Sequence, residues 1–296
     1  MVNLPEVNPQ DSRMTPNTFE GGSLTGEIGP LTYYAGVLTA MKVRNADEFV
    51  NMAKVADADI TGNSGMYLGG VAFSPIEELK ARTSLYVVPN LLVSSYSDAA
   101  WDYELSDQVK LRASGQFMYQ SSIGDALLTG AGYDAWIGGI RGDFTYSGLT
   151  LTAGYTFAGD FSGTEDSWQA PYGSWPGYTN MIVKVFDRSE EQTLLLGASF
   201  DFGKVGAEGL VVKAVAALDM KVKDGLDTWN EYDFSADYRF SARDGDLDWL
   251  APLWLRASYA IVDTEDPDGT HDQLDDLRLI VNYELQFKGS DLPPNG

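Results

Sequence analysis

The chain has 296 residues, and 43 acidic residues against 20 basic ones give it a net charge of −23 at pH 7. This excess of carboxylates offers no basic face to phosphates, so nucleic acid is excluded as an expected partner. The absence of cysteine excludes disulfides and thiolate metal sites, and a single histidine excludes a histidine-rich cluster, so we expect no metal and no cofactor.

Hydropathy leaves two classes of protein open. The chain has no run of 18 apolar residues and therefore no expected transmembrane helix. Its mean hydropathy of −0.18 is typical of a soluble protein. Membrane β-barrels have the same average, because their lipid-facing and lumen-facing residues alternate. Residues 1–16 have no basic n-region and no apolar h-region, so they do not resemble a signal peptide. We expect a chain that stays inside the cell or one that has lost its start.

Strict alternation of apolar and polar residues recurs along the chain, and only a strand sorts alternate residues onto two faces. Within 109–120, for example, Leu111 and Phe117 lie opposite Arg112 and Gln116. We predict about thirteen strands of roughly 9–14 residues, and residues 80–104 are the hardest to divide. The clearest strands are 109–120, 149–157, 194–202, 210–220, 230–241, 253–261 and 277–287.

Short and long connections alternate between these strands. Short turns are predicted at 27–30, 74–75, 106–107, 147–148 and 203–209. Longer polar segments are predicted at 44–64, 121–130, 160–190, 222–228 and 264–272. Residues 45–56 have the pattern of a short helix within a loop. This alternation is typical of an up-and-down barrel in the outer membrane, with short turns towards the periplasm and long loops outside.

Aromatic residues gather near the predicted strand ends, as interfacial girdles do. They are Tyr146, Phe157, Tyr232, Phe240, Tyr283 and Phe287. The strands of a soluble β-sandwich or barrel also alternate apolar and polar residues. Such strands are usually about 5–6 residues long, whereas the strands predicted here are longer. We predict an all-β transmembrane antiparallel up-and-down β-barrel, one domain over residues 1–296 with a C-terminal tail at 288–296. Because bacterial barrels have an even number of strands, either N-terminal strands are missing or the count is wrong by one.

Several long motifs resemble the OprD family of substrate-specific outer-membrane porins. They are NPQDSRMTPNTFE at 8–20, KVRNADEFVNM at 42–52, GDALLTG at 124–130, PYGSWPGYT at 171–179, MIVKVFDR at 181–188 and DLRLIVNY at 276–283. The resemblance covers residues 8–287 and implies a barrel of about 18 strands, secreted through a signal peptide, as a monomer or a loose homotrimer. It also implies that about the first third of the family pattern is absent, and that residues 288–296 follow the final aromatic, Phe287.

Eight cations on the polar face are predicted to face the lumen and guide solutes. They are Arg82, Lys110, Arg112, Arg141, Lys213, Arg239, Arg256 and Arg278. Guanidinium groups on neighbouring strands can pass a carboxylate along by bidentate hydrogen bonds, and such a basic row is what the resemblance implies. The alternative is that acids of the same face neutralise them as wall salt bridges. These acids are Asp143, Asp201, Asp219, Asp233 and Asp237.

The longest predicted loop, 160–190, carries four aromatic residues: Trp168, Tyr172, Trp175 and Tyr178. Such a loop can fold into the mouth of a barrel and bracket a solute between its rings. It can equally form a rigid external cap packed on its neighbours. The sequence leaves both interpretations open.

The function that we predict is an outer-membrane porin of a Gram-negative bacterium and not an enzyme. It gives passive, selective diffusion of small polar nutrients, which the resemblance specifies as basic amino acids, small peptides or carboxylates. Its partners are these solutes, outer-membrane lipid and lipopolysaccharide. His271 beside Asp272 lacks a nucleophile within its motif and is weak support for catalysis. The alternative is a plugged structural or adhesive barrel whose loops bind surface partners, and conduction through the lumen separates the two.

Overall fold

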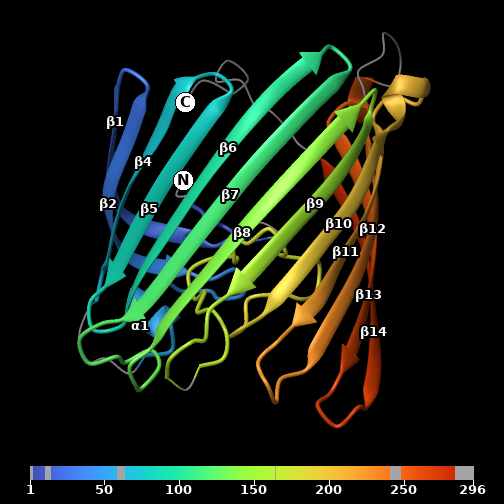
Figure 1. Ribbon diagram of the computed structural model, residues 1–296. Coiled ribbons are helices and arrows are strands. Elements are labelled where there is room, and N and C mark those ends of the chain that lie inside the picture. Colours follow the sequence, from blue (N-terminus) through green and yellow to red (C-terminus); the bar gives the residue numbers. More distant parts are fainter. Residues whose placement is uncertain (1–2, 11–14, 59–63, 164, 241–247, 284–296) are drawn as a thin grey trace.

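The fold is built on one antiparallel sheet (Figure 1), and the computed structural model describes residues 3–10, 15–58, 64–163, 165–240 and 248–283. Among these residues, thirteen long strands pair in sequence order, and a two-residue strand, β3, pairs beside them with β2. The strands are β1 (Thr18–Ile28), β2 (Leu31–Lys42), β3 (Val50–Asn51), β4 (Met66–Ile76), β5 (Leu79–Val88), β6 (Leu92–Ser106), β7 (Val109–Ser122), β8 (Asp134–Tyr146), β9 (Leu149–Ala158), β10 (Gln192–Asp201), β11 (Leu210–Lys221), β12 (Thr228–Arg239), β13 (Leu253–Glu265) and β14 (His271–Tyr283). Helices are short: α1 (Met52–Val55), η1 (Phe202–Val205) and η2 (Asp248–Leu250).

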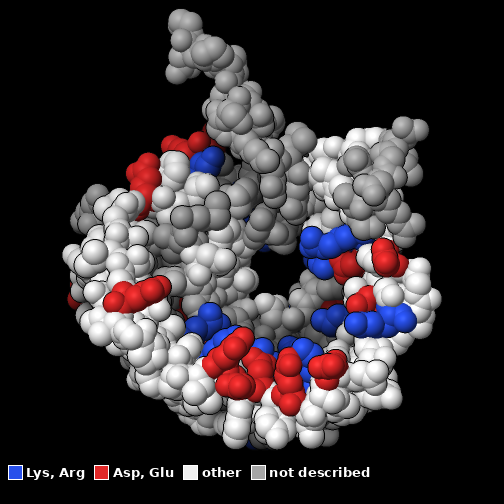
Figure 2. Space-filling model, turned by 90° about the horizontal axis from the view of Figure 1, so that it is seen from above, with Lys and Arg blue, Asp and Glu red and all other residues white. Residues whose placement is uncertain are grey.

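The tilted strands curve round a central opening, which is visible from the end that carries the short turns (Figure 2). The described sheet begins at β1 and ends at β14. Since successive strands reverse direction, β1 and β14 run the same way along the wall. None of the described helices is long and apolar enough to span a membrane.

Side chains on the two faces of the sheet differ as the alternation predicts. Large apolar residues remain exposed on the outer face of successive strands. Examples are Phe73, Trp101, Leu111, Phe117, Ile140, Phe144, Leu151, Phe234, Leu277 and Leu279. Their sequence neighbours, such as Arg112 and Gln116, point to the opposite face. A continuous apolar outer surface of this kind suits contact with lipid. The predicted fold class and number of long strands are confirmed within the described residues.

Three predicted boundaries are wrong. Ser74 and Pro75 lie within β4, and the turn follows at Glu77 and Glu78. The β4–β5 register shifts there, between Phe73 and Ile76, because a proline has no N–H for the ladder and is tolerated at such a bulge.

The other two corrections concern loops. Only Met52–Val55 of the predicted helix region 45–56 is helical, since Asn51 caps it by accepting a hydrogen bond from the Lys54 N–H at 2.9 Å. The predicted loop 264–272 shortens to residues 266–270, because β13 and β14 pair as far as Glu265 and His271. Phe287, the tail at 288–296 and residues 11–14 of the first family motif lie outside the described residues.

The core of the molecule lies inside the curve of the sheet, towards the long loops. Buried side chains from the N-terminal segment, α1, the inner faces of β2–β8 and the loop between β9 and β10 form one cluster there. Its largest fully buried members include Met52, Met118, Tyr133 and Tyr172. The interior of the sheet is therefore packed at one end and open at the other.

Candidate lumen site

The loop between β9 and β10, residues 159–191, is called the inner loop below. On one side, the Gln120 amide of β7 donates to the Gln169 carbonyl at 2.7 Å. On the other, the Ile182 N–H donates to Asp233 of β12 at 3.1 Å, and Arg278 of β14 donates to the Ile182 carbonyl at 2.9 Å. These strands lie far apart in the sheet, so the inner loop crosses the interior (Figure 1).

The N-terminal segment, residues 3–10, packs against the same loop. The Asn8 side-chain oxygen accepts from the Ser174 N–H and hydroxyl, both at 3.2 Å, and the Asn8 N–H donates to the Tyr172 carbonyl at 3.3 Å. A Cβ atom at Gly173 would lie 2.7 Å from the Glu6 carbonyl oxygen, so only glycine permits this close approach. The N-terminal segment and the inner loop together narrow the interior.

The four aromatic residues predicted to line the mouth fall into two groups. Trp168, Tyr172 and Trp175 are at most 4% exposed, and the Tyr172 ring meets the Tyr86 ring of β5 edge-on at 5.7 Å. These three rings pack the inner loop against the wall. Tyr178 is half-buried and lines a cavity, so it is the ring placed where a solute could meet it.

A cavity of about 530 Å³ lies between the tip of the inner loop and the wall formed by β8–β13. Five of the residues that the sequence singled out line it together with Tyr178: Arg141, Lys213, Arg256, Asp233 and Asp237. Side chains from four strands and a loop therefore meet at one point. The cavity presents charges of both signs to a solute small enough to enter.

Six of the eight predicted cations contact a carboxylate of the same wall. The pairs are Arg82–Asp98, Lys110–Glu104, Arg112–Asp102 at 3.0 Å, Arg141–Asp143 at 2.8 Å, Arg256–Asp237 at 2.7 Å and Arg278–Asp276 at 2.7 Å. Their cationic side chains remain 36% to 52% exposed. Basic and acidic side chains accordingly lie side by side around the opening (Figure 2).

The other two predicted cations are Lys213 and Arg239. In the described part of the chain, no carboxylate lies within 4.0 Å of the Lys213 ammonium, and residue 213 is paired in the sheet with Ser199 and Ser235 of the neighbouring strands. The Arg239 guanidinium lies 5.1 Å from the centre of the Trp254 ring. Lys213 is thus the cation of the cavity that the described wall acids leave without an ion pair.

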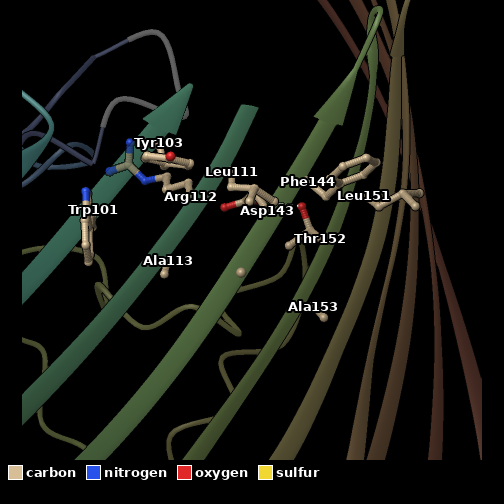
Figure 3. Close-up of a pocket in the computed structure, with 11 residues that line it drawn as sticks. Trp101, Tyr103, Leu111, Arg112, Ala113, Asp143, Phe144, Leu151, Thr152 and Ala153 are labelled. Carbon is tan, nitrogen blue, oxygen red and sulfur yellow. Dashed lines mark hydrogen bonds between the residues drawn. The ribbon is translucent and has the colours of Figure 1, made fainter. Parts of the chain in front are cut away.

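The wall at β6–β9 shows how two surfaces alternate along one sheet (Figure 3). Trp101, Leu111, Phe144 and Leu151 rim an apolar depression of about 770 Å³, with small residues such as Ala113 between them. This depression belongs to the lipid-facing surface. Arg112 and Asp143 come from alternate positions of the same strands and belong to the lumen.

The family model of OprD outer membrane porins matches residues 1–287. The chain belongs to the OprD family. The porin is thus a protein of the Gram-negative outer membrane, and the members of its family are channels. No curated protein sequence matches the chain.

Solved Pseudomonas aeruginosa channels share this porin's fold. OccK1 (OpdK) is 20% identical with a TM-score of 0.78, and the match covers 95% of this chain and 73% of that one. OpdL is 21% identical with a TM-score of 0.79, covering 95% and 74%. OccK9 (OpdG) is 22% identical with a TM-score of 0.78, covering 95% and 70%.

Sequence reasoning missed two features of the porin's interior. Arg188, in the inner loop, donates to Glu191, to Asp219 of β11 at 2.6 Å and to the Asp227 carbonyl at 2.6 Å. Glu231 of β12 is fully buried beneath the same loop. Strand periodicity could not find Arg188, because loop residues have no alternation. Strand periodicity does place Glu231 on the inner face of β12, two residues before Asp233.

The Glu6 carboxyl of the porin is buried, and this predicts a pH effect on stability. Burial raises its pKa from 4.5 to about 7, and hydrogen bonds from Ser94 and Trp168 oppose the rise. Between these values the folded chain holds a proton that the unfolded chain releases, so the free energy of unfolding falls as pH rises through this range and then levels off. We expect Glu6→Gln to reduce the fall in the free energy of unfolding and to be more stable than the parent at about pH 8, by on the order of 3 kcal/mol. Part of the fall should remain, because burial also raises the pKa of Asp187.

The measurement is urea unfolding of the detergent-solubilised porin at about pH 4 and about pH 8. Glu27→Gln, at the exposed end of β1, is the control and should leave the pH dependence of the parent unchanged. Equal pH dependence in the parent and in Glu6→Gln would contradict the prediction.

Proposed function

We propose that this porin lets small solutes that carry a carboxylate diffuse passively through its lumen, among them basic amino acids, small peptides and simple carboxylates. The observation that carries this proposal is Lys213, a cation of the cavity with no carboxylate within 4.0 Å in the described part of the wall. A solute carboxylate can supply this partner through a charge-assisted hydrogen bond. All three solute classes carry that group.

The paired cations support the same proposal. Ion pairs that remain this exposed contribute at most about 1 kcal/mol. A passing carboxylate can therefore displace Asp102 from Arg112 at little cost, because these side chains are 35% and 48% exposed. The wall acids also keep any one cation from holding the solute too tightly, which conduction requires. The same cations then form wall salt bridges when no solute is present and bind the solute carboxylate as it passes.

The inner loop supplies the size limit in this proposal. Its backbone crosses the lumen and leaves a cavity of about 530 Å³ at its tip. A solute passes by exchanging water for the polar side chains around it, with no covalent step. Selectivity then comes from the width of the passage and from the charges that line it.

We also propose that further strands join the edges of β1 and β14. Unpaired backbone N–H and C=O groups at membrane depth are too costly to persist. The two edges run in the same direction, so an odd number of added strands would close the wall with antiparallel pairs throughout. Residues 277–283 contain no proline, so every one of them has the backbone N–H that such pairing requires.

The test is single-channel recording from the envelope protein in a planar bilayer under a salt gradient. We expect discrete current steps and a reversal potential that reports anion preference. We also expect arginine to reduce the current more than its decarboxylated analogue agmatine, and benzoate more than benzyl alcohol. Equal effects within each pair would show that the carboxylate is not recognised. Inserted protein without current steps would support a plugged structural barrel.

A further inference from the structure

The backbone of residues 182–184, in the middle of the inner loop, is hydrogen-bonded to side chains of β12. One Glu231 carboxylate oxygen accepts from the Val183 N–H at 2.7 Å, and the other accepts from the Lys184 N–H at 2.6 Å. Glu231 is fully buried, so water does not compete for these bonds. Both oxygens of one strand carboxylate are thus used to hold the loop.

Asp233 extends this attachment by one residue. One of its carboxylate oxygens accepts from the Ile182 N–H at 3.1 Å, and Arg278 of β14 donates to the Ile182 carbonyl at 2.9 Å. The Met181 N–H donates to the Lys184 carbonyl at 3.0 Å, which closes a turn over the same residues. Three consecutive loop N–H groups therefore end on two carboxylates of one strand.

Trp229 also lies on the inner face of β12 and contacts the inner loop. The Lys184 ammonium lies 3.8 Å, and the Arg188 guanidinium 3.4 Å, from the centre of its ring. Both cations come from the inner loop. Trp229, Glu231 and Asp233 are alternate residues that face inward together. Trp229 and Glu231 contact the loop rather than the open lumen, whereas Asp233 contacts the loop and also lines the cavity.

We propose that Glu231 and Asp233 are positioning residues that hold the inner loop across the lumen and thereby set the width and the ion selectivity of the channel. The proposal rests on the proposed function, in which the inner loop is the size limit. Carboxylates suit this task, because each presents two acceptors to neighbouring backbone N–H groups. The sequence places Asp233 among the lumen acids that could neutralise the cations as wall salt bridges, and in the structure it accepts a hydrogen bond from the loop.

The experiment uses the absence of native cysteine. A single reporter, Met181→Cys, is placed in the clamped turn, and its labelling rate with a small water-soluble thiol reagent is measured in the intact, reconstituted porin. In this background we expect Glu231→Ala to raise the labelling rate at least about tenfold, because the turn leaves the wall. The same variant should raise single-channel conductance several-fold and weaken the reversal potential.

Asp237→Ala is the matched control. Asp237 is also an inward acid of β12, but it accepts from Arg256 at 2.7 Å and from Trp254 at 2.9 Å instead of from the loop. Its loss should leave the labelling rate unchanged. Glu231→Gln, which keeps one acceptor, should restore part of the parent labelling rate and conductance.

If Glu231→Ala fails to assemble, Ile182→Pro tests the same attachment from the loop side, because it removes the N–H that Asp233 accepts. Unchanged labelling in an assembled Glu231→Ala or Ile182→Pro porin would overturn the proposed clamp. Faster labelling without a change in conductance would overturn the claim that the clamp sets the channel width. The carboxylate preference of the proposed function is read separately, from the paired solutes.

Discussion

Replacing Arg188 by Leu should lower the free energy of unfolding of this porin by about 3–5 kcal/mol. The Arg188 side chain is 6% exposed and contacts Glu191 and Asp219, whose side chains are 1% and 0% exposed. Loss of the guanidinium leaves two buried carboxylates without a cation and the Asp227 carbonyl without its donor. Urea unfolding in detergent, followed by tryptophan fluorescence, measures the change.

Lys221→Met is the control for this prediction. Lys221 also contacts a carboxylate, Glu190 at 2.6 Å, but its side chain is 52% exposed, so its removal should cost far less stability than the removal of Arg188. Similar losses in the two variants would show that the buried network does not stabilise the loop more than a surface ion pair does.

Replacing Lys213 by Glu should shift the reversal potential of the channel strongly towards cations. The cavity has three cations and two acids among its lining residues. The substitution changes this balance to two cations and three acids, at a place that the inner loop narrows. Charges that line a narrow passage control ion selectivity most strongly. Single-channel recording under a salt gradient measures the shift, and block by benzoate should weaken in parallel.

Lys110→Glu makes the same change of charge near the short-turn end of the wall. Lys110 is 52% exposed there and contacts Glu104, so water and salt should screen most of its effect. We expect a clearly smaller shift than for Lys213→Glu. Equal shifts would mean that the cavity beneath the inner loop does not control passage, and no shift in either variant would remove both residues from the pathway.

Alternation along each strand made much of the fold predictable, because lipid and lumen each select one face of the wall. The period of two correctly separated Leu111 from Arg112 and placed Lys213 and Arg256 inward, where they line one cavity. The turn at Ser74 and Pro75 was mispredicted for a local reason. A proline usually marks the end of a strand, whereas here a bulge accommodates it within β4.

The contacts of the inner loop could not be predicted from periodicity. Its aromatic residues indicated a packed or lining element, but the sequence offered no means of separating buried Trp168 and Trp175 from the partly exposed Tyr178. That difference depends on which wall each residue meets. Gln120 and Glu231, which hold the loop at two opposite sides, lie 49 and 48 residues from their partners in the chain.

Periodicity and local chemistry are properties of neighbouring residues, so the amino-acid order alone was enough to specify a membrane sheet, its lipid-facing surface and the charged face of its lumen. Which carboxylate meets which cation depends on strand register, as with Arg112 and Asp102, which lie opposite each other on β7 and β6. Where the loop crosses the lumen depends on contacts between distant strands. Both result from long-range packing, which no local pattern encodes.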